Sequence, residues 1–401
     1  MIKIVIKNKQ CIKNICVCLG SFLMFFGHNT AIGSIGKILI YLGMFILLMY
    51  ILGTTCRNIK LTMNKDKCIF IVLLILLSLG IIVQKDLSVM QKISPLISFF
   101  IMLVFYVYGY HLLNDFKIIR LFGYTILVTF IMSMIFTPLL GGEIVTIPTE
   151  GMSYALTAGL GHKNASSICI FSAYMAISSY FKFVEKNKAD CIAIVLLIIF
   201  MLAGASRATW ILMLVYTALL NQDVFYKIKK ESRFIFYIFL MMFICLCGYV
   251  FISMIIMESA SYGFRFLGLW SYLNQYGTDA NVMLFGHGDI LYNSNYGDYD
   301  HRIWILLGGI GTFEIAYLDV LAKNGLLGLI VYLYVYFIPI FKGFKSKLKQ
   351  NKIMFFSLSI TALISGMVDI FITQIIYPYA VFVLCTISWV NYNYKNENRL
   401  K

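Results

Sequence analysis

The stretch from residue 67 to 83, KCIFIVLLILLSLGIIV, carries no charge after its first residue. Runs of about 20 apolar residues are long enough to cross the hydrocarbon core of a bilayer. Similar runs recur along the chain, in which 61% of the 401 residues are hydrophobic, only 13% are charged and the mean hydropathy is +0.85. A water-soluble core cannot bury that much apolar surface. The composition therefore indicates an integral membrane protein.

The apolar runs predict an all-α fold, a polytopic bundle of about twelve transmembrane helices that forms a single membrane domain over residues 1–401. The expected spans are 14–28, 37–53, 67–83, 94–113, 118–140, 164–181, 190–204, 206–220, 234–256, 323–341, 353–371 and 374–391. A large external loop, 257–322, separates the ninth span from the tenth. A second external segment is expected over 141–163. Because loops carry most binding and catalytic residues, function is expected in these two segments.

The basic residues lie in short runs between the apolar spans. Seven segments hold 25 of the 33 Lys and Arg: 1–13, 54–67, 114–120, 182–190, 221–233, 342–352 and 392–401. The positive-inside rule makes these segments cytoplasmic. Both termini are then cytoplasmic and the protein belongs in the cytoplasmic (inner) membrane. The net charge of +15 thus reports topology, and no nucleic-acid partner is expected.

The stretch 190–220 is one long helix or two short helices broken at Gly204-Ala205-Ser206-Arg207. One helix would place the basic segment 221–233 opposite the basic loop 182–190. Two helices place both segments in the cytoplasm. The charge pattern therefore favours the pair.

Three of the seven arginines, Arg207, Arg265 and Arg302, lie on the predicted outer side, where basic residues are scarce. Arg207 stands at the tip of two helices of about 15 residues, each rising about 22 Å against a core of about 30 Å. An arginine at that depth costs at least about 2.5–3.5 kcal/mol on insertion scales and is expected to have an anionic partner. The planar guanidinium binds two phosphate oxygens at once. The alternative is a snorkelling arginine at the interface.

Two external histidines stand in polar motifs. His162 lies in Gly161-His162-Lys163-Asn164, directly before a predicted helix whose orphan N–H groups Asn164 or a nearby serine is expected to cap. Such a helix start also favours anions, so His162 and Asn164 are candidate substrate-binding residues. His287 lies in Gly286-His287-Gly288 and is a candidate catalytic residue, with a simple turn as the alternative.

Glu314 and Asp319 lie five residues apart, before or within the start of the tenth span. Either acid is a candidate general base poised by partial burial. A helix-start charge or a solvated loop acid is the alternative. The chain contains no HExxH, paired CxxC, GxxxxGK[ST] or GxSxG motif. No metal or other cofactor is therefore expected.

Four motifs, taken in this order, resemble the bacterial surface-polysaccharide polymerases and ligases: the Wzy-type O-antigen or capsule repeat-unit polymerases and the O-antigen ligases. They are Gly161-His162-Lys163-Asn164; Ser206-Arg207 with Ala208-Thr209-Trp210; Arg265 with Trp270 and Leu284-Phe285-Gly286-His287-Gly288; and Tyr317-Leu318 with Asn324-Gly325-Leu326-Leu327-Gly328-Leu329. The resemblance covers about 150–330, and the first 150 residues match by hydropathy alone.

The resemblance implies a metal-independent membrane glycosyltransferase. Such enzymes move a glycan from an undecaprenyl diphosphate donor to an acceptor sugar hydroxyl on the outer side of the membrane. Arg207 and Arg265 would neutralise the diphosphate, Glu314 or a histidine such as His287 would be the base, and Arg302 and Asp319 would contact substrate. The expected partners are the lipid-linked oligosaccharide, the bilayer, and a chain-length regulator and flippase.

Two other functions stay open. In the ligases a His-Asn pair precedes the Tyr-Leu, whereas this chain has Glu314-Ile315. That departure favours a polymerase over a ligase. A twelve-helix flippase or transporter of lipid-linked sugar would normally show two similar halves, and no such similarity is visible here.

Overall fold

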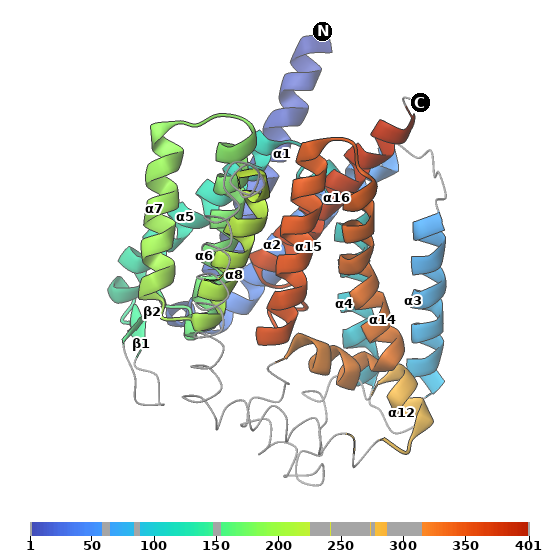
Figure 1. Ribbon diagram of the computed structural model, residues 1–401. Helices are drawn as coiled ribbons and strands as arrows, with labels where there is room; N and C mark the ends of the chain where they lie inside the picture. Colours follow the sequence, from blue (N-terminus) through green and yellow to red (C-terminus); the bar gives the residue numbers. More distant parts are fainter. Residues whose placement is uncertain are drawn as a thin grey trace.

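A computed structural model of the protein describes residues 2–57, 65–83, 89–146, 154–224, 241, 273, 277–286 and 315–399. These residues form a bundle of roughly parallel and antiparallel helices (Figure 1). The helices are α1 (Ile2–Phe26), α2 (Ser34–Arg57), α3 (Lys65–Val83), α4 (Val89–Tyr108), α5 (Phe116–Leu139), α6 (Lys163–Phe183), α7 (Lys188–Ala203), α8 (Arg207–Leu220), α12 (Ala280–Phe285), α14 (Ala316–Lys345), α15 (Lys349–Val368) and α16 (Pro378–Arg399), with short 3-10 turns η1 (Thr30–Ile32) and η2 (Gly109–His111). Strands β1 (Val145–Thr146) and β2 (Ala155–Leu156) pair antiparallel, with Val145 opposite Leu156.

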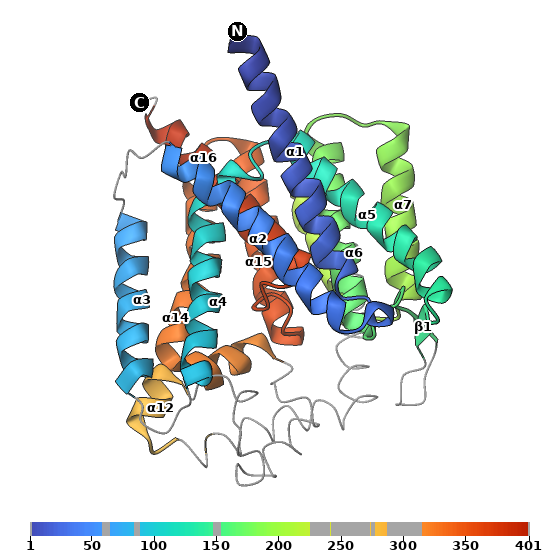
Figure 2. The ribbon, with the colours of Figure 1, turned by 180° about the vertical axis from the view of Figure 1, so that it is seen from behind.

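The protein is a helical membrane protein. Within the described residues, five helical segments are long and apolar enough to cross a bilayer: Ser34–Cys56, Lys92–His111, Phe116–Leu139, Ala316–Lys345 and Lys349–Val368. Their outward faces carry exposed apolar side chains, such as Ile38 and Phe45 of α2. In water such a surface would be unfavourable, and in lipid it is the expected one. Figure 2 shows α1 and α2 packed side by side along one face of the bundle.

Helices α6 and α16 form the centre of the bundle. Residues 165–180 of α6 and 378–391 of α16 are all buried. The α6 stretch contains many Ser and Ala residues, and small side chains let neighbouring helices approach closely. A helix buried on every side needs no lipid-facing stripe.

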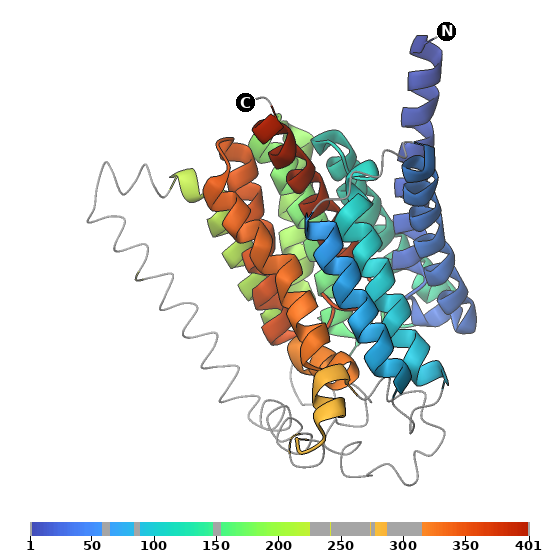
Figure 3. The ribbon, with the colours of Figure 1, turned by 90° about the vertical axis from the view of Figure 1, so that its right-hand side faces the viewer.

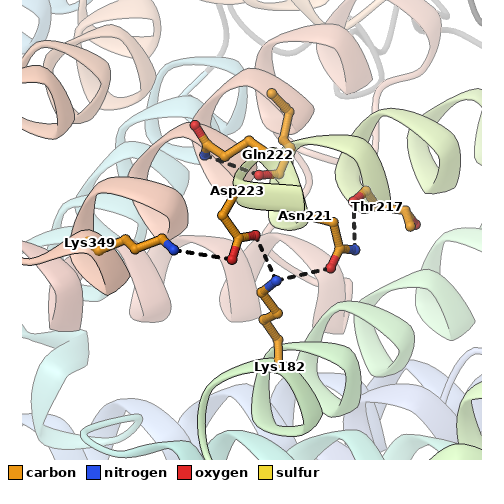
Figure 4. A network of polar contacts seen from close by, with 7 residues as sticks. Lys182, Thr217, Asn221, Gln222, Asp223 and Lys349 are labelled. Carbon is orange, nitrogen blue, oxygen red and sulfur yellow. Dashed lines mark hydrogen bonds and ion pairs between the residues drawn. The ribbon is translucent and has the colours of Figure 1, made fainter. Parts of the chain in front are cut away.

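Polar contacts tie several connections together at the end of the bundle where both chain termini lie, here called the terminal end (Figure 1). Lys182 in the last turn of α6 donates to Asp223 Oδ1 at 2.7 Å and to Asn221 Oδ1 at 3.3 Å, and Lys349 donates to Asp223 Oδ2 at 3.2 Å (Figure 4). Partial burial would raise the pKa of Asp223, but the two lysines outweigh it and lower that pKa to about 2. Asp223 therefore bridges the ends of α6 and α8 and the start of α15.

Further contacts bring the remaining connections to the same end. Glu397 near the C-terminus accepts from the backbone N–H of Leu348 at 2.8 Å and so joins α16 to the α14–α15 turn. Lys13 of α1 donates to Asn114 Oδ1 at 2.6 Å. The segments 114–120, 182–190, 342–352 and 392–399, all predicted to share one side of the membrane, therefore share one end of the bundle.

The helix boundaries agree with the predicted spans at most positions. The break within 190–220 is present, because α7 ends at Ala203 and α8 begins at Arg207. Apart from residue 241, the predicted span 234–256 lies outside the described residues. Every other predicted span overlaps a described helix.

The predicted boundary between the loop 257–322 and the tenth span lies at a break between two helical segments. Gly325 interrupts α14 with φ 64° and ψ −168°, a conformation that helices do not tolerate. The long second segment of α14 therefore starts directly after Gly325, close to the predicted start of the tenth span at 323. A short helical segment, 316–324, precedes the break, and α12 forms inside the predicted loop.

Candidate functional site at the loop end

The end of the bundle opposite the termini, here called the loop end, is braced by the α1–α2 turn. Asn29 is 1% exposed and donates to Thr137 Oγ1 at the end of α5, at 2.6 Å. Thr30 donates its backbone N–H to Gly159 O at 2.8 Å. His28 contacts Ile376 O through Nε2 at 3.2 Å. These contacts fix the segment that leads into α6.

His28 is held in its neutral form by its surroundings. Burial lowers its pKa, the hydrogen bond to Ile376 O opposes that shift only in part, and the pKa falls to about 4. Its ring stacks on Tyr377 with 4.1 Å between ring centroids. His28 therefore packs against Tyr377 and binds the 376–377 backbone at the loop end.

His162 is the N-cap of α6. It has extended backbone angles, and its Nδ1 atom accepts from the backbone N–H of Asn164 at 3.2 Å. The expectation that Asn164 or a serine caps this helix is therefore wrong, because the His162 imidazole accepts from the backbone N–H of Asn164 at the helix start. His162 is exposed, and Lys163 and Asn164 are half-buried. The start of α6 is thus open to solvent at the loop end.

Arg207 is the first residue of α8 and follows a tight turn. Ala205 in that turn has φ 51°, a left-handed conformation that costs a non-glycine residue about 1–2 kcal/mol. The Trp210 indole N–H donates to Met201 O at 3.0 Å and ties the start of α8 to the end of α7. Arg207 is half-buried, with its Nη1 atom shielded from solvent. The turn therefore holds the guanidinium partly below the surface.

The starts of α6 and α8 lie against each other. A Cβ atom added to Gly204, in the turn before α8, would stand 2.3 Å from Ser167 Oγ in the first turn of α6. Only glycine leaves room for this approach. Each helix start carries roughly half a positive elementary charge from its aligned peptide dipoles. Two such starts, with Arg207 beside them, make an electropositive place suited to phosphate.

Ser166 and Ser167 add hydroxyl groups to this place. Both side chains are 0% exposed, and neither Oγ atom has a hydrogen-bond partner among the described residues. Sequence reasoning missed them because a serine at the start of a helix is usually read as a cap. The repeated Ser after Asn164 was the only signal available in the sequence.

Asp319 lies in the first turn of α14 and is 5% exposed. It forms an ion pair with Lys323, one turn later, with 3.0 Å between Asp319 Oδ1 and Lys323 Nζ. The lysine compensates the buried carboxylate, and sequence reasoning had not singled it out. Asp319 is thus engaged within its own helix at the loop end.

The break in α14 is built from two glycines of two predicted motifs. A Cβ on Gly286, which follows α12, would stand 2.3 Å from Asn324 N, and a Cβ on Gly325 would stand 2.3 Å from the carbonyl carbon of Leu284. Both glycines also have positive φ. Residues 284–286 and 323–325 are therefore in direct backbone contact. Figure 3 shows α12 beside α14 at this end of the bundle.

Four predicted site residues lie outside the described part of the chain: Arg265, His287, Arg302 and Glu314. Of the described ones, His162 and Asn164 lie at the start of α6 and Arg207 lies at the neighbouring start of α8. Asp319 lies at the same end of the bundle on α14, which packs against α15, α12 and α3.

Within the described residues, no group of three or more His, Cys, Asp or Glu side chains is arranged to hold a metal ion. Comparison of the chain with protein-family models, with curated proteins and with solved structures finds no match. The function therefore has to be argued from the chain itself.

Proposed function

We propose that the protein polymerises lipid-linked oligosaccharide repeat units. In this reaction a glycan moves from an undecaprenyl diphosphate donor to the hydroxyl of an acceptor glycan on the outer side of the cytoplasmic membrane. The acceptor oxygen forms the new bond to the anomeric carbon, the acceptor proton passes to a base, and the diphosphate leaves on its lipid. The protein is then a membrane glycosyltransferase.

The observation that carries the proposal is the close packing of the α6 start against the turn before Arg207. The departing diphosphate gains negative charge in the transition state, and groups already oriented toward that charge stabilise it most. Two helix starts and a half-buried arginine are such groups. The hydroxyls of Ser166 and Ser167 add further donors in the first turn of α6.

The acceptor side of the reaction is assigned to the predicted loop 257–322. Glu314 and His287 are the candidate bases, and Arg265 and Arg302 are the candidate further contacts to the diphosphate and the sugars. Asp319 stays a candidate for substrate binding, and its ion pair with Lys323 holds its carboxylate in the first turn of α14.

The proposal includes the topology that the charge pattern predicts. The chain crosses the cytoplasmic membrane about twelve times, the terminal end is cytoplasmic, and the loop end faces outward. The lipid-linked donor arrives through a flippase, and a chain-length regulator sets polymer size. The shared position of four basic segments, 114–120, 182–190, 342–352 and 392–399, at the terminal end supports this orientation.

The two alternatives differ in the step that they perform. An O-antigen ligase would use the same diphosphate site and transfer finished polymer to a lipid anchor. A flippase would move the lipid-linked unit without breaking a glycosidic bond. The polymerase and the ligase both break a bond on the outer side of the membrane, and Arg207 at a helix start at the loop end suits that step in either of them. Glu314-Ile315 in place of a His-Asn pair favours the polymerase over the ligase.

The test is deletion of the gene in the bacterium that carries it, with the surface glycan resolved by gel electrophoresis. Loss of a polymerase leaves single repeat units on the surface, because flipping and ligation continue. Loss of a ligase leaves polymer on the lipid carrier and none on the surface. Loss of a flippase leaves single lipid-linked units facing the cytoplasm. Either of the last two results would replace the polymerase assignment.

A further inference from the structure

A basic cluster lies at the terminal end, on the side of the bundle that α5, α6 and α7 form. Helices α5 and α7 each pack against α6 (Figure 2). Near the start of α5, Arg120 donates its Nε–H to Asp190 Oδ1 in the first turn of α7, at 2.8 Å. Tyr124 donates its hydroxyl to the same oxygen at 2.7 Å. Arg120 therefore ties α5 to α7 and takes no part in the site at the loop end.

The surroundings of Arg120 hold its guanidinium in place. Its Cζ atom lies 4.7 Å from the ring centroid of Tyr180 on α6 and 5.3 Å from that of Tyr124 on α5. A guanidinium over an aromatic ring is attracted by the negative face of that ring. The Asp190 side chain is 0% exposed, whereas the Arg120 side chain is 30% exposed. The ion pair is therefore closed on the aspartate side and open on the arginine side.

The open side of the ion pair suits an oxyanion. A guanidinium carries five N–H donors, and Asp190 accepts the one on Nε of Arg120. Paired donors of one guanidinium bind two oxygens of a phosphate or carboxylate group. Because Asp190 and two rings already fix the arginine, binding an oxyanion there orders little further side chain.

The depth of Arg120 identifies the source of the oxyanion. Helix α5 is one of the segments long enough to cross a bilayer, and its 24 residues rise about 36 Å against a hydrocarbon core of about 30 Å. Arg120 follows the first residue of α5 by four positions, or about 6 Å. It therefore lies near the edge of the core, from which an arginine side chain reaches the headgroups. Phospholipid phosphates are the oxyanions at this level.

An apolar stripe continues along α5 from this level into the membrane. Val128, Ile131 and Ile135 follow Tyr124 at spacings of four, three and four residues, so that they share one face of the helix. They are 50%, 37% and 57% exposed, respectively. A lipid whose acyl chains lie along this stripe has its phosphate beside Arg120. A free phosphate ion would contact only the charged end.

The charge of this region favours an anionic headgroup. Lys117 is exposed, lies one turn before Arg120, and shares the face of Tyr124 seven residues later. The two segments 114–120 and 182–190 together carry five basic and three acidic residues, a net charge of +2. Basic residues at this level attract anionic lipids. The ammonium group of a zwitterionic lipid would be repelled by Lys117.

We propose that Arg120 and Lys117 bind the phosphate of an anionic phospholipid in the leaflet at the terminal end, with its acyl chains along the apolar stripe of α5. This inference does not depend on the polymerase assignment, because it concerns the membrane around the bundle and not the site at the loop end. It would hold equally for a ligase or a transporter.

The test is lipid binding by the purified full-length protein in detergent, measured by native mass spectrometry. The probes are phosphatidylglycerol and phosphatidylcholine with the same acyl chains, with inorganic phosphate as a competitor. The first variant combines Arg120→Gln with Asp190→Asn, which keeps the net charge and leaves no buried carboxylate unpaired. The second, Lys117→Gln, keeps the ion pair and changes only an exposed residue. The control is Lys345→Gln, because Lys345 is an exposed cation at the same end of the bundle, on α14.

We expect the wild type to bind phosphatidylglycerol at least about fivefold more tightly than phosphatidylcholine. The double variant should bind phosphatidylglycerol at least about tenfold more weakly than the wild type, because a charged hydrogen-bond partner is lost. Lys117→Gln should weaken binding about fivefold, and Lys345→Gln should leave it unchanged. Wild-type affinity in both the double variant and Lys117→Gln would overturn the proposal. Equal binding of the two lipids, or displacement of phosphatidylglycerol by inorganic phosphate, would overturn it as well.

Discussion

Arg207 is the residue on which the proposed chemistry depends most. Its place at the start of α8, beside the start of α6, gives the leaving diphosphate a charged partner. We predict that Arg207→Ala lowers polymerisation by about a hundredfold or more, the size of effect seen when one charge-stabilising donor is lost. Arg207→Lys should restore only part of the activity, because a lysine cannot bind two phosphate oxygens in one plane.

The measurement for Arg207 is polymer length and amount at equal protein level in the membrane. Lys345→Ala is the control, because Lys345 is an exposed cation at the opposite end of the bundle. Wild-type polymer from Arg207→Ala would remove the arginine from the mechanism.

His28 is predicted to make stability depend on pH. Its pKa is about 4 in the folded protein and 6.5 in an unperturbed histidine. Between these values the unfolded chain binds a proton that the folded chain does not, so stability falls as the pH falls from 6.5 toward 4. The slope from this one group is at most about 1.4 kcal/mol per pH unit.

Thermal unfolding of the purified protein at pH 7 and pH 5 measures the effect of His28. His28→Gln keeps a donor for Ile376 O and does not titrate, so its midpoint should change less between the two pH values. An equal change in wild type and variant would assign the pH dependence to other groups.

Among the elements, α12 is the shortest helix and is wedged between two others. A Cβ on Gly80 of α3 would stand 1.8 Å from Cδ1 of Phe285, the last residue of α12. Gly286 then meets the break in α14. Phe285 therefore fixes the end of α12 against α3.

We predict that Gly80→Val lowers stability by about 1–3 kcal/mol, the usual range for overpacking. Gly53→Val on α2 is the matched control, because no atom lies within 4 Å of a Cβ added there. Thermal midpoints of the two variants give the comparison. In the Phe285→Ala variant, the further change Gly80→Val should lower stability only slightly, because the ring that the valine would meet is absent. Similar losses from Gly80→Val with and without the phenylalanine ring would contradict this packing.

The sequence predicted some elements well for a clear physical reason. The break before Arg207 followed from charge, because only two helices keep both flanking basic segments on one side of the membrane. The start of the long segment of α14 was predicted within a few residues, because Asn324-Gly325 has the composition of a helix boundary, whereas the short helical segment 316–324 before the break was not predicted. The His162 cap was missed because histidine is not among the preferred capping residues.

The candidate site was predictable in its parts but not in its assembly. Arg207 and His162 were recognised from polar residues in apolar surroundings, a signal that sequence carries. The contact of Gly204 with Ser167, and that of Gly286 with the break in α14, join residues far apart in the chain. Neither helical periodicity nor the distribution of charge indicates which distant residues come into contact. Ser167 and Lys323 were therefore identified only by the structure.

The molecule as a whole is a bundle whose two ends differ in their residues and contacts. The terminal end is tied by the bridge of Lys182, Asp223 and Lys349 and holds the basic segments. The loop end holds two adjoining helix starts with Arg207. The basic terminal end suits anchoring in the membrane, and the electropositive site at the loop end suits binding of the substrate.

The most direct test of the proposed activity is polymerisation by the purified protein in lipid vesicles. The substrate is the single-unit undecaprenyl diphosphate glycan extracted from the deletion strain. We predict a ladder of lipid-linked glycans that differ by one repeat unit, formed by the wild type and reduced at least about a hundredfold in Arg207→Ala. Unextended substrate with the folded wild-type protein, whether or not it crosses the vesicle membrane, would contradict the account.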